Sequence, residues 1–370
     1  METKAAVFYG VDQPLAVERL TLSPIQPGEV LVKMGAAGVC HSDYHVMTGQ
    51  AAHDCPVVLG HEGAGKILDV GQDVSELNVG DHVVLSWIPY CGTCFFCEHD
   101  QTHLCQTHKE PLWDGTLMDG SCRLSNAGGP VRQLSMIGCW AEYAVVPQES
   151  CVTIDKSVPF DVAALLGCAV TTGVGAALNK AQVTPGSTVV VIGAGGVGLS
   201  IIMGARLAGA ARIIAIDTSA CVEAKARSLG ATEFLLATQG DALSSVLDMT
   251  MHGADYVFEA VGNRSLQREA IEYCRPGGTV VFVGLDANDA TFEFPSTMVT
   301  RTEKVVTGSI FGSACTDRDF RRFAGHYLDG ELPVDQLIGR RYDIDDVNQA
   351  VVDMIEGKAG RGVILFGSME

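Results

Sequence analysis

The stretch TVVVIGAGGVGLSIIMGARLAGAARIIAID, residues 188–217, decides the fold of a large part of this chain. Its first five residues are mostly β-branched and predict a buried strand, and a glycine-rich turn follows at once. The first glycine permits a tight turn, the second lets a ligand approach the backbone, and the third lets the next helix pack closely on the strand. The N-terminus of that helix supplies amide donors for a pyrophosphate. The residues of the turn are Gly193, Ala194, Gly195, Gly196, Val197 and Gly198.

The second strand of this stretch ends in Asp217, at about the 20-residue distance from the turn that is typical of dinucleotide-binding units. An acidic side chain there accepts hydrogen bonds from ribose hydroxyls and repels a 2′-phosphate. Thr218 and Ser219, which follow, carry no positive charge. We therefore predict NAD rather than NADP as the cofactor. The alternative is a glycine-rich turn that binds nothing, with Asp217 as a solvated strand end.

Apolar strands alternate with helix-like segments on both sides of this stretch, from about residue 170 onward. Such alternation predicts a parallel sheet covered by helices on both faces, which is the doubly wound Rossmann arrangement. The expected strands are Thr188–Ile192, Arg212–Asp217, Ala254–Glu259, Thr279–Gly284 and Val305–Phe311.

The first 150 residues are different in character, with short β-rich segments separated by Pro and Gly. Residues 106–140 show little periodicity and suggest one long loop. Helices at Asp317–Leu328 and Asp345–Glu356 indicate that the chain then returns to the first domain. We therefore predict an α/β protein, with a β-rich domain at residues 1–169 and 311–370 and a nucleotide-binding domain at residues 170–310.

The composition excludes several classes of partner. The 370 residues contain 25 Lys and Arg against 44 Asp and Glu, a formal net charge of −19. So acidic a surface repels phosphate backbones and anionic headgroups, and we expect no nucleic-acid partner and no membrane. We identify residues 189–205 as the only long apolar stretch, and its glycines argue against a membrane span. Thirteen cysteines without a secretory signal indicate reduced thiols in the cytoplasm.

Four of the cysteines lie in one short segment, CGTCFFCEHDQTHLC. Cys91, Cys94 and Cys97 are spaced by two residues, and Cys105 follows after a longer gap. Four thiolates at this spacing can surround one tetrahedral Zn²⁺ at Zn–S distances of about 2.3 Å. An iron–sulfur cluster would need a tighter run that ends in Cys-Pro. Because four cysteines leave no open coordination position, we predict a structural zinc site, with four free thiols as the alternative.

Other potential ligands are dispersed along the chain. GVCHSDYH places Cys40 beside two histidines, GHE supplies His61 and Glu62, and LLGC ends in Cys168. Taken singly, Cys168 is more often a small core residue, and His61 is more often a histidine satisfied by a hydrogen bond. Two thiolates and one imidazole together would leave a fourth zinc position open for water or substrate, as in catalytic sites.

These motifs together resemble the zinc-dependent medium-chain alcohol dehydrogenases, over essentially the whole chain. The motifs that carry the resemblance are GVCHSD, GHE, the four-cysteine segment, LLGCAVTTG, and VIGAGGVG followed by IIAID. The resemblance implies a GroES-like catalytic domain, a Rossmann NAD-binding domain, two zinc ions per chain and NAD. It also implies hydride transfer between a primary alcohol, aliphatic or aromatic, and NAD.

The resemblance assigns roles to individual residues. Ser42 is expected beside the bound alcohol, His45 at the outer end of a proton relay, and Asp43 bonded to His61. The implied ligands of the catalytic zinc are Cys40, His61, Cys168 and, as an outer or transient ligand, Glu62. The implied ligands of the structural zinc are Cys91, Cys94, Cys97 and Cys105. The implied cofactor contacts are His41, Thr172, Gly193, Gly195, Gly196, Val197, Gly198, Asp217 and Arg361.

Some positions depart from the family pattern. His41 stands where many members place Arg against the pyrophosphate, so that contact is expected to be weaker and pH-dependent. Gln50 and Ala51 replace an acidic pair near the glutathione pocket of class III members, which argues against a glutathione adduct as substrate. Trp87 aligns with an aromatic residue that lines the substrate pocket, as in some bacterial thiol-linked and nicotinoprotein members. The alternative is an ordinary core tryptophan.

Several other functions stay open at this point. The main one is a thiol-adduct-dependent formaldehyde dehydrogenase, or a nicotinoprotein alcohol dehydrogenase that keeps NAD tightly bound. A zinc-free reductase would need neither Cys40 nor Cys168, and a polyol dehydrogenase would typically carry Glu in place of Cys168. A non-catalytic NAD-binding protein would need neither set of metal ligands. We expect a cytoplasmic homodimer, with a homotetramer as the alternative, that acts on a small alcohol or aldehyde.

Overall fold

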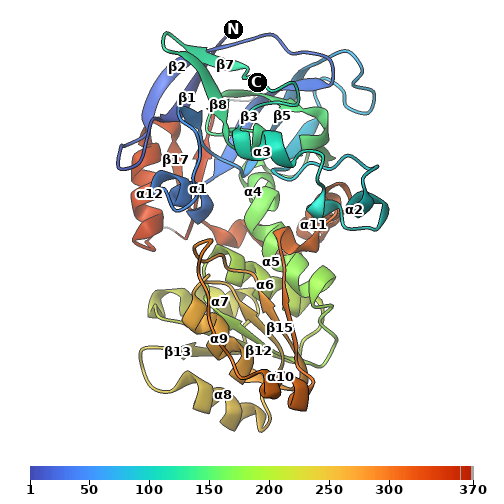
Figure 1. Ribbon diagram of the computed structural model, residues 1–370, viewed down its shortest axis with the longest axis vertical. Coiled ribbons are helices and arrows are strands. Elements are labelled where there is room, and N and C mark those ends of the chain that lie inside the picture. Colours follow the sequence, from blue (N-terminus) through green and yellow to red (C-terminus); the bar gives the residue numbers. More distant parts are fainter. Residues whose placement is uncertain (359, 368–370) are drawn as a thin grey trace. The chain divides into compact units, whose positions relative to one another are not determined.

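The computed structural model describes residues 1–358 and 360–367, and the chain divides into two compact units (Figure 1). Unit 1 comprises Met1–Cys168, Cys315–Gly330 and the chain from Leu337 onward. Unit 2 comprises Ala169–Ala314 and Glu331–Gln336. The boundaries expected from sequence, 1–169 with 311–370 and 170–310, differ by a few residues and do not anticipate that residues 331–336 group with unit 2.

Unit 1 is built on two β-structures. The strands of a closed barrel are, in order, β1 (Glu2–Phe8), β2 (Ala16–Leu22), β7 (Leu124–Asn126), β8 (Gly129–Gln133) and β4 (Val57–Val58). The strands of a seven-stranded sheet are, in order, β10 (Cys151–Ile154), β6 (His82–Leu85), β5 (Gly63–Val70), β3 (Glu29–Gly38), β18 (Arg361–Leu365) and β17 (Ile338–Asp343), with β9 (Tyr143–Pro147) paired to β3. The central strand β3 pairs antiparallel with β5, β9 and β18.

The core of unit 1 fixes the end of this central strand. Val30, Val32 and Met34 alternate along β3 and are fully buried, as the two-residue period of a strand requires. The fully buried indole of Trp140 donates through Nε1 to the Gly38 carbonyl oxygen at 3.0 Å. Gly38 is the last residue of β3, so this bond holds the backbone just before Cys40.

Helices complete unit 1. They are α1 (His41–Met47), α2 (Phe95–Glu98), α3 (Lys109–Asp114), α4 (Phe160–Leu165), α11 (Thr316–Leu328) and α12 (Val347–Ile355). The helices expected in the tail are therefore confirmed as α11 and α12, the second preceded by a short 3₁₀ turn, Ile344–Asp346. The long loop expected at residues 106–140 is wrong, because α3, β7 and β8 lie within it. Leu112, Leu124 and Val131 from these elements are buried in a common core, and such short elements leave no readable period in the sequence.

Unit 2 contains a parallel sheet, as predicted, but with six strands rather than the five expected. Its strands are, in spatial order, β13 (Glu233–Leu236), β12 (Arg212–Asp217), β11 (Thr188–Ile192), β14 (Ala254–Glu259), β15 (Cys274–Phe282) and β16 (Val305–Gly308). Its helices are α5 (Thr171–Gly175), α6 (Gly196–Leu207), α7 (Glu223–Leu229), α8 (Ala242–Thr250), α9 (Arg264–Tyr273) and α10 (Ser296–Thr302). Strand β13 was missed from sequence because all four of its residues are only half-buried. The order of the strands reverses beside β11, where open parallel sheets bind ligands.

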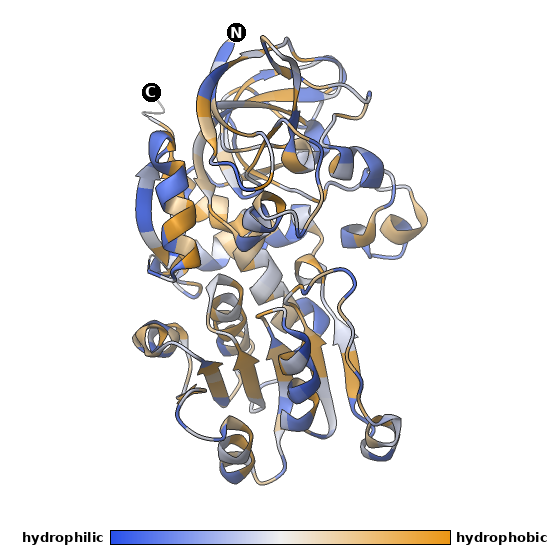
Figure 2. Ribbon diagram, turned by 60° about the vertical axis from the view of Figure 1, so that its left-hand side comes forward, coloured by the Kyte–Doolittle hydropathy of each residue, from blue (hydrophilic) through white to orange (hydrophobic). Residues whose placement is uncertain are grey.

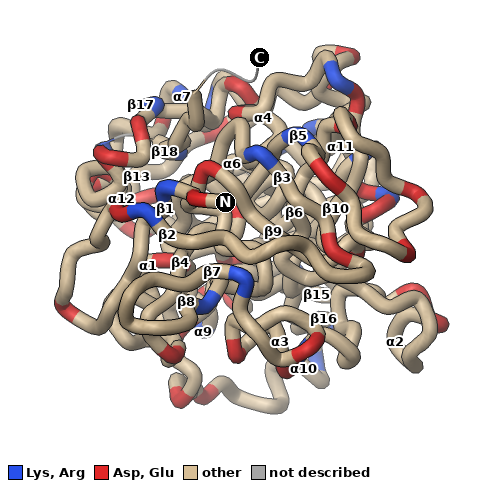
Figure 3. Tube along the Cα trace, turned by 90° about the horizontal axis from the view of Figure 1, so that it is seen from above, with Lys and Arg blue, Asp and Glu red and all other residues tan. Residues whose placement is uncertain are grey.

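A second long apolar stretch was not identified from the sequence. Residues Phe160–Lys180 form a helical run long and apolar enough to cross a membrane by length and composition alone. However, 83% of its most apolar window is buried inside the protein, which is typical of a core helix. Figure 2 shows that hydrophobic residues also dominate the inner strands of unit 2. Figure 3 shows the acidic residues spread over many elements rather than gathered on one.

Candidate active site and metal centres

The turn from β3 into α1 is organised by one buried carboxylate, that of Asp43. Its Oδ2 accepts from the backbone N–H of Cys40 at 3.3 Å. Its Oδ1 accepts from the backbone N–H of Gly60 at 3.0 Å and contacts Nδ1 of His61 at 3.0 Å. Asp43, the third residue of α1, therefore bonds the backbone of the N-cap residue Cys40 and also fixes the orientation of the His61 ring.

Cys40, His61, Glu62 and Cys168 come together in unit 1. Their ligand atoms all lie within 4.8 Å of one another, and all four residues are buried. Cys168 sits in a wide π-helical turn, Leu166–Val170, and such turns are frequent at functional sites.

The donor set fits a metal ion. Nδ1 of His61 is held by Asp43, while Nε2 is buried and has no hydrogen-bond partner in the described part of the chain. A buried ring nitrogen without a partner is costly unless it binds something. Two sulfurs beside this nitrogen make a set that Zn²⁺ prefers.

The electrostatics of the site favour a metal-binding thiolate. A hydrogen bond from the Cys168 thiol is the largest influence on the pKa of Cys40 and lowers it well below its usual value; Arg361 and His61 act in the same direction, against burial. Burial alone would lower the pKa of His61, but the Asp43 carboxylate and the Cys40 thiolate outweigh it and raise it well above its usual value.

Arg361 lies against Glu62 in a buried ion pair. Its Nε donates to Glu62 Oε2 at 3.1 Å, and its Nη2 donates to Glu62 Oε1. Burial raises the pKa of Glu62, and the guanidinium opposes that change. The family resemblance implies that Arg361 contacts a pyrophosphate, and that contact stays a prediction. The pairing with Glu62 was not anticipated, because 299 positions along the chain separate the two residues.

The residues expected near the alcohol, together with His41, which is expected near the pyrophosphate, lie on α1 and after β6. His41 is exposed, while Ser42 and His45 are half-buried on the same short helix. The ring of Trp87 stands edge-on to that of His61, with centroids 6.2 Å apart and an interplanar angle of 77°. Trp87 therefore lies beside the predicted metal ligand, whereas the proton relay through Ser42 and His45 stays a prediction.

The four-cysteine segment folds into a compact lobe. The sulfur of Cys97 lies 3.9 Å from that of Cys91 and 3.5 Å from that of Cys94, and 3.9 Å separates the sulfurs of Cys94 and Cys105. A tetrahedron with Zn–S bonds of about 2.3 Å has sulfur–sulfur edges of about 3.8 Å. The backbone N–H of Cys94 donates to Cys91 Sγ at 3.3 Å. A hydrogen bond from the Thr107 side chain is the main reason why the pKa of Cys91 is lowered to about 5.

The glycine turn of unit 2 has the geometry expected of a nucleotide site. Gly193 has a φ of +90°, and a Cβ on Gly198 would lie 1.8 Å from the Gly193 carbonyl oxygen. A Cβ on Gly195 would meet no protein atom within 4 Å, so the open space lies on the side where a ligand would approach. Oδ2 of Asp217 accepts from the backbone N–H of Ala194 at 2.7 Å, which ties the acid to the turn.

The remaining predicted contacts belong to the same unit. Gly196 and Val197 form the first turn of α6, and Thr172 is half-buried in α5. Beside the turn lies a cavity of about 380 Å³ whose lining includes Gly193 and Asp217.

Comparison with known proteins gives the family. Residues 26–156 match the alcohol dehydrogenase GroES-like domain, and residues 196–327 match the zinc-binding dehydrogenase family. An NDMA-dependent alcohol dehydrogenase from Amycolatopsis methanolica is 39% identical over 372 residues, which cover 100% of both chains. The chain belongs to the zinc-dependent medium-chain alcohol dehydrogenases.

Two further relatives are close to this dehydrogenase. A probable S-(hydroxymethyl)glutathione dehydrogenase 1 of Schizosaccharomyces pombe is 37% identical over 366 residues, 98% of this chain and 96% of the relative. The crystal structure of benzyl alcohol dehydrogenase from Acinetobacter calcoaceticus has a TM-score of 0.95 and 31% identity, over 99% of this chain and 100% of that one. The predicted family, fold class and reaction class are thereby confirmed: the dehydrogenase is a zinc-dependent alcohol oxidoreductase.

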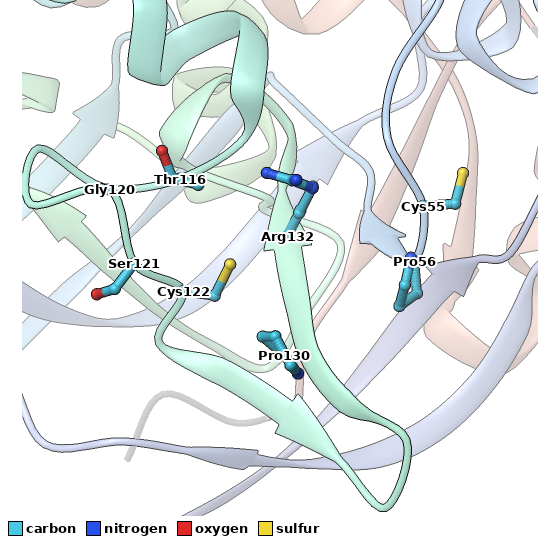
Figure 4. Close-up of a pocket in the computed structure, with 8 residues that line it drawn as sticks. All are labelled: Cys55, Pro56, Thr116, Gly120, Ser121, Cys122, Pro130 and Arg132. Carbon is cyan, nitrogen blue, oxygen red and sulfur yellow. The ribbon is translucent and has the colours of Figure 1, made fainter.

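One cavity of this dehydrogenase was not anticipated from sequence. It has a volume of about 460 Å³, lies in unit 1 and is lined by Cys55, Cys122 and Arg132, among others (Figure 4). The Arg132 guanidinium already donates to Asp54 Oδ2 at 2.9 Å and to the Asp114 carbonyl oxygen at 2.6 Å. Its charge is therefore already paired. No motif signals this cavity, because its lining comes from three separate segments.

Proposed function

We propose that this dehydrogenase oxidises a primary alcohol to its aldehyde, with NAD as hydride acceptor and two zinc ions per chain. The catalytic ion would be held by Cys40, His61 and Cys168. The observation that supports this most is the buried imidazole nitrogen of His61, which lies beside two sulfurs and has no hydrogen-bond partner in the described chain. Cys91, Cys94, Cys97 and Cys105 would hold the structural ion.

The chain's own residues prepare the reaction. Zn²⁺, when bound, supplies a Lewis acid that lets an alcohol lose its proton near neutral pH. Asp43 holds His61 in the tautomer that presents Nε2. Trp87 stands edge-on to His61 and would limit the space beside it. Ser42 would take the alcohol proton and His45 would pass it to solvent, because an imidazole exchanges protons readily at neutral pH.

The cofactor preference follows from Asp217. Its carboxylate is anchored by the backbone N–H groups of Ala194 and Ser219, at 2.7 and 2.8 Å. A 2′-phosphate on the adenosine ribose would meet this fixed negative charge, with no basic side chain at the next two positions. NAD is therefore the proposed cofactor.

A second function has support from the relatives. The NDMA-dependent relative and the S-(hydroxymethyl)glutathione dehydrogenase relative are 39% and 37% identical to this chain. They favour a nicotinoprotein that keeps NAD bound, or an enzyme for a thiol adduct. Gln50 and Ala51, in place of an acidic pair, argue against glutathione as the thiol.

The assembly and location proposed are a cytoplasmic homodimer. Strand β16 lies at the edge of the unit 2 sheet, with Val305 exposed, and could pair with its counterpart in a second copy. None of the thirteen cysteines, all of which lie in the described residues, forms a disulfide, in keeping with a reducing compartment.

The test is a combination of elemental analysis and steady-state kinetics. We expect two zinc ions per chain, and turnover of a panel of aliphatic and aromatic primary alcohols with NAD. The panel is repeated with an artificial acceptor, which separates exchangeable from tightly bound NAD. Fully active protein that contains one zinc ion or none would contradict the proposal. Cys168→Ser should abolish turnover and leave the fold intact.

A further inference from the structure

The cavity of about 380 Å³ in unit 2 runs along the carboxyl ends of neighbouring strands. Its lining includes Gly193 after β11, Asp217 at the end of β12, and Asp241 after β13. In the sheet these three strands lie side by side, in the order β11, β12, β13. A dinucleotide with its pyrophosphate at the glycine turn and its ribose at Asp217 therefore directs its base toward the residues that follow β13.

Apart from its carboxylates, the lining of this cavity is largely apolar. Its walls are made by apolar side chains, among them Ile192, Ile216, Ala242 and Leu266. Among the described residues, the lining of the cavity includes three carboxylates, those of Asp217, Asp241 and Glu269, and no Lys or Arg. Apolar walls with a few convergent polar groups are the usual lining of a small-molecule site, where the polar groups fix orientation and specificity.

Asp241 is held in place as an ionised hydrogen-bond acceptor. Asp241 is the N-cap of α8. Its Oδ1 accepts from the backbone N–H of Ser244 at 3.1 Å, and its Oδ2 accepts from the Ser244 hydroxyl at 2.6 Å. These hydrogen bonds lower the pKa of Asp241 below its usual value, so it carries a charge at neutral pH. A carboxylate has about four acceptor positions, and two bonds from Ser244 leave capacity for a ligand.

Glu269 is a weaker candidate for contact with a ligand. The hydroxyl of Tyr273 donates to its Oε1 at 2.6 Å. Burial, followed by the Glu269 carboxylate itself, raises the pKa of Tyr273, so the phenol keeps its proton and the bond persists. Asp241 is thus the carboxylate best placed to meet the edge of a base.

We propose that Asp241 selects the base of the dinucleotide by accepting a hydrogen bond from the 6-amino group of adenine. The proposal rests on the use of NAD by this chain. An ionised carboxylate only accepts, so it matches the amino group, the donor that adenine presents at its 6-position. A base with a 6-oxo group, such as hypoxanthine, places a carbonyl oxygen against the carboxylate and is disfavoured.

The experiment compares equilibrium binding of NAD with that of its hypoxanthine analogue. Calorimetric titration of the purified protein gives both dissociation constants; where NAD copurifies, displacement of NAD by the analogue gives the same ratio. Because Asp241 is solvent-exposed, we expect NAD to bind roughly tenfold more tightly than the analogue. This ratio corresponds to the low end of the free-energy range for hydrogen bonds to charged groups.

Asp241→Asn is the decisive variant. Asparagine is as good an N-cap as aspartate, and its amide can either accept from an amino group or donate to a carbonyl. The preference should fall to about twofold or less. Asp241→Ser, which also caps a helix, should weaken NAD binding without improving that of the analogue. Asp248→Asn removes the same charge from the exposed side of α8 and should leave the preference intact.

The outcomes separate this proposal from the one on which it rests. If the wild-type protein binds both dinucleotides equally, or if Asp241→Asn keeps the full preference, Asp241 does not read the base. If the protein binds neither dinucleotide, the proposed use of NAD itself fails.

Discussion

Replacement of Asp43 by Asn should weaken metal binding at the catalytic site without changing any metal ligand. Asp43 accepts from the N–H groups of Cys40 and Gly60 and orients the His61 ring. An asparagine amide can satisfy two of these contacts through its oxygen, but its NH₂ group then faces the third donor. Loss of such a supporting carboxylate typically lowers metal affinity by about 10–100-fold, which corresponds to about 1.4–2.7 kcal/mol.

The measurement is a competition titration. The purified variant is equilibrated with a chelator of known zinc affinity, and the zinc retained per chain is followed as the chelator concentration rises. The catalytic-site ion should leave the variant at a free chelator concentration about 10–100-fold lower than the one needed for the wild-type protein. The chelator concentration that removes the ion of the four-cysteine lobe should be the same in both proteins. Asp69→Asn, an exposed carboxylate on β5, is the matched control.

A folding defect is separable from this effect. One buried donor without a partner costs about 1–3 kcal/mol, so thermal unfolding of the zinc-loaded variant should show a modest drop in Tm and one cooperative transition. The reasoning would be refuted by an Asp43→Asn variant that folds and retains the catalytic zinc as tightly as the wild-type protein.

Three further predictions concern other residues. Cys94→Ser should destabilise the chain, since the lobe folds around its metal, and a thermal melt that matches the wild type would contradict a structural role. Asp217→Gly should narrow the preference for NAD over NADP; wild-type protein with equal kcat/KM for the two cofactors would show that Asp217 does not discriminate. His45→Gln should slow alcohol oxidation by up to about 100-fold at neutral pH, with recovery at higher pH or on addition of an imidazole buffer. An unchanged pH–rate profile and no response to buffer would indicate that His45 is a surface histidine.

The sequence was informative where one short motif carries both structure and chemistry. The glycine turn and Asp217 predicted a strand, a helix and a second strand, and the parallel sheet follows from their repetition. The four-cysteine segment likewise predicted a compact lobe, because its spacing is set by local chain geometry. Strand β13 was missed because its half-buried residues lack a strong pattern, and Asp241 was missed with it.

Contacts between distant residues were beyond a reading of one sequence. Arg361 was expected to face a phosphate, yet its guanidinium lies against Glu62, the residue just before β5. Nothing local to either residue signals this, since it depends on β18 pairing with β3 beside β5. The segment 106–140 was misjudged for a similar reason, because its helix and strands are stabilised by burial against the barrel rather than by their own periodicity.

The pairing of β18 with β3 has a consequence for biosynthesis. Unit 2 is inserted in the sequence between the two strands, so a ribosome completes it before β18 emerges. Until then the Glu62 carboxylate has no Arg361 to neutralise it, and the edge of β3 that β18 later occupies is open to other strands. The Rossmann unit can therefore fold first, and the predicted metal site of this dehydrogenase can be completed only after β18 has emerged. A stalled nascent chain would hold a complete nucleotide unit and an unfinished metal site.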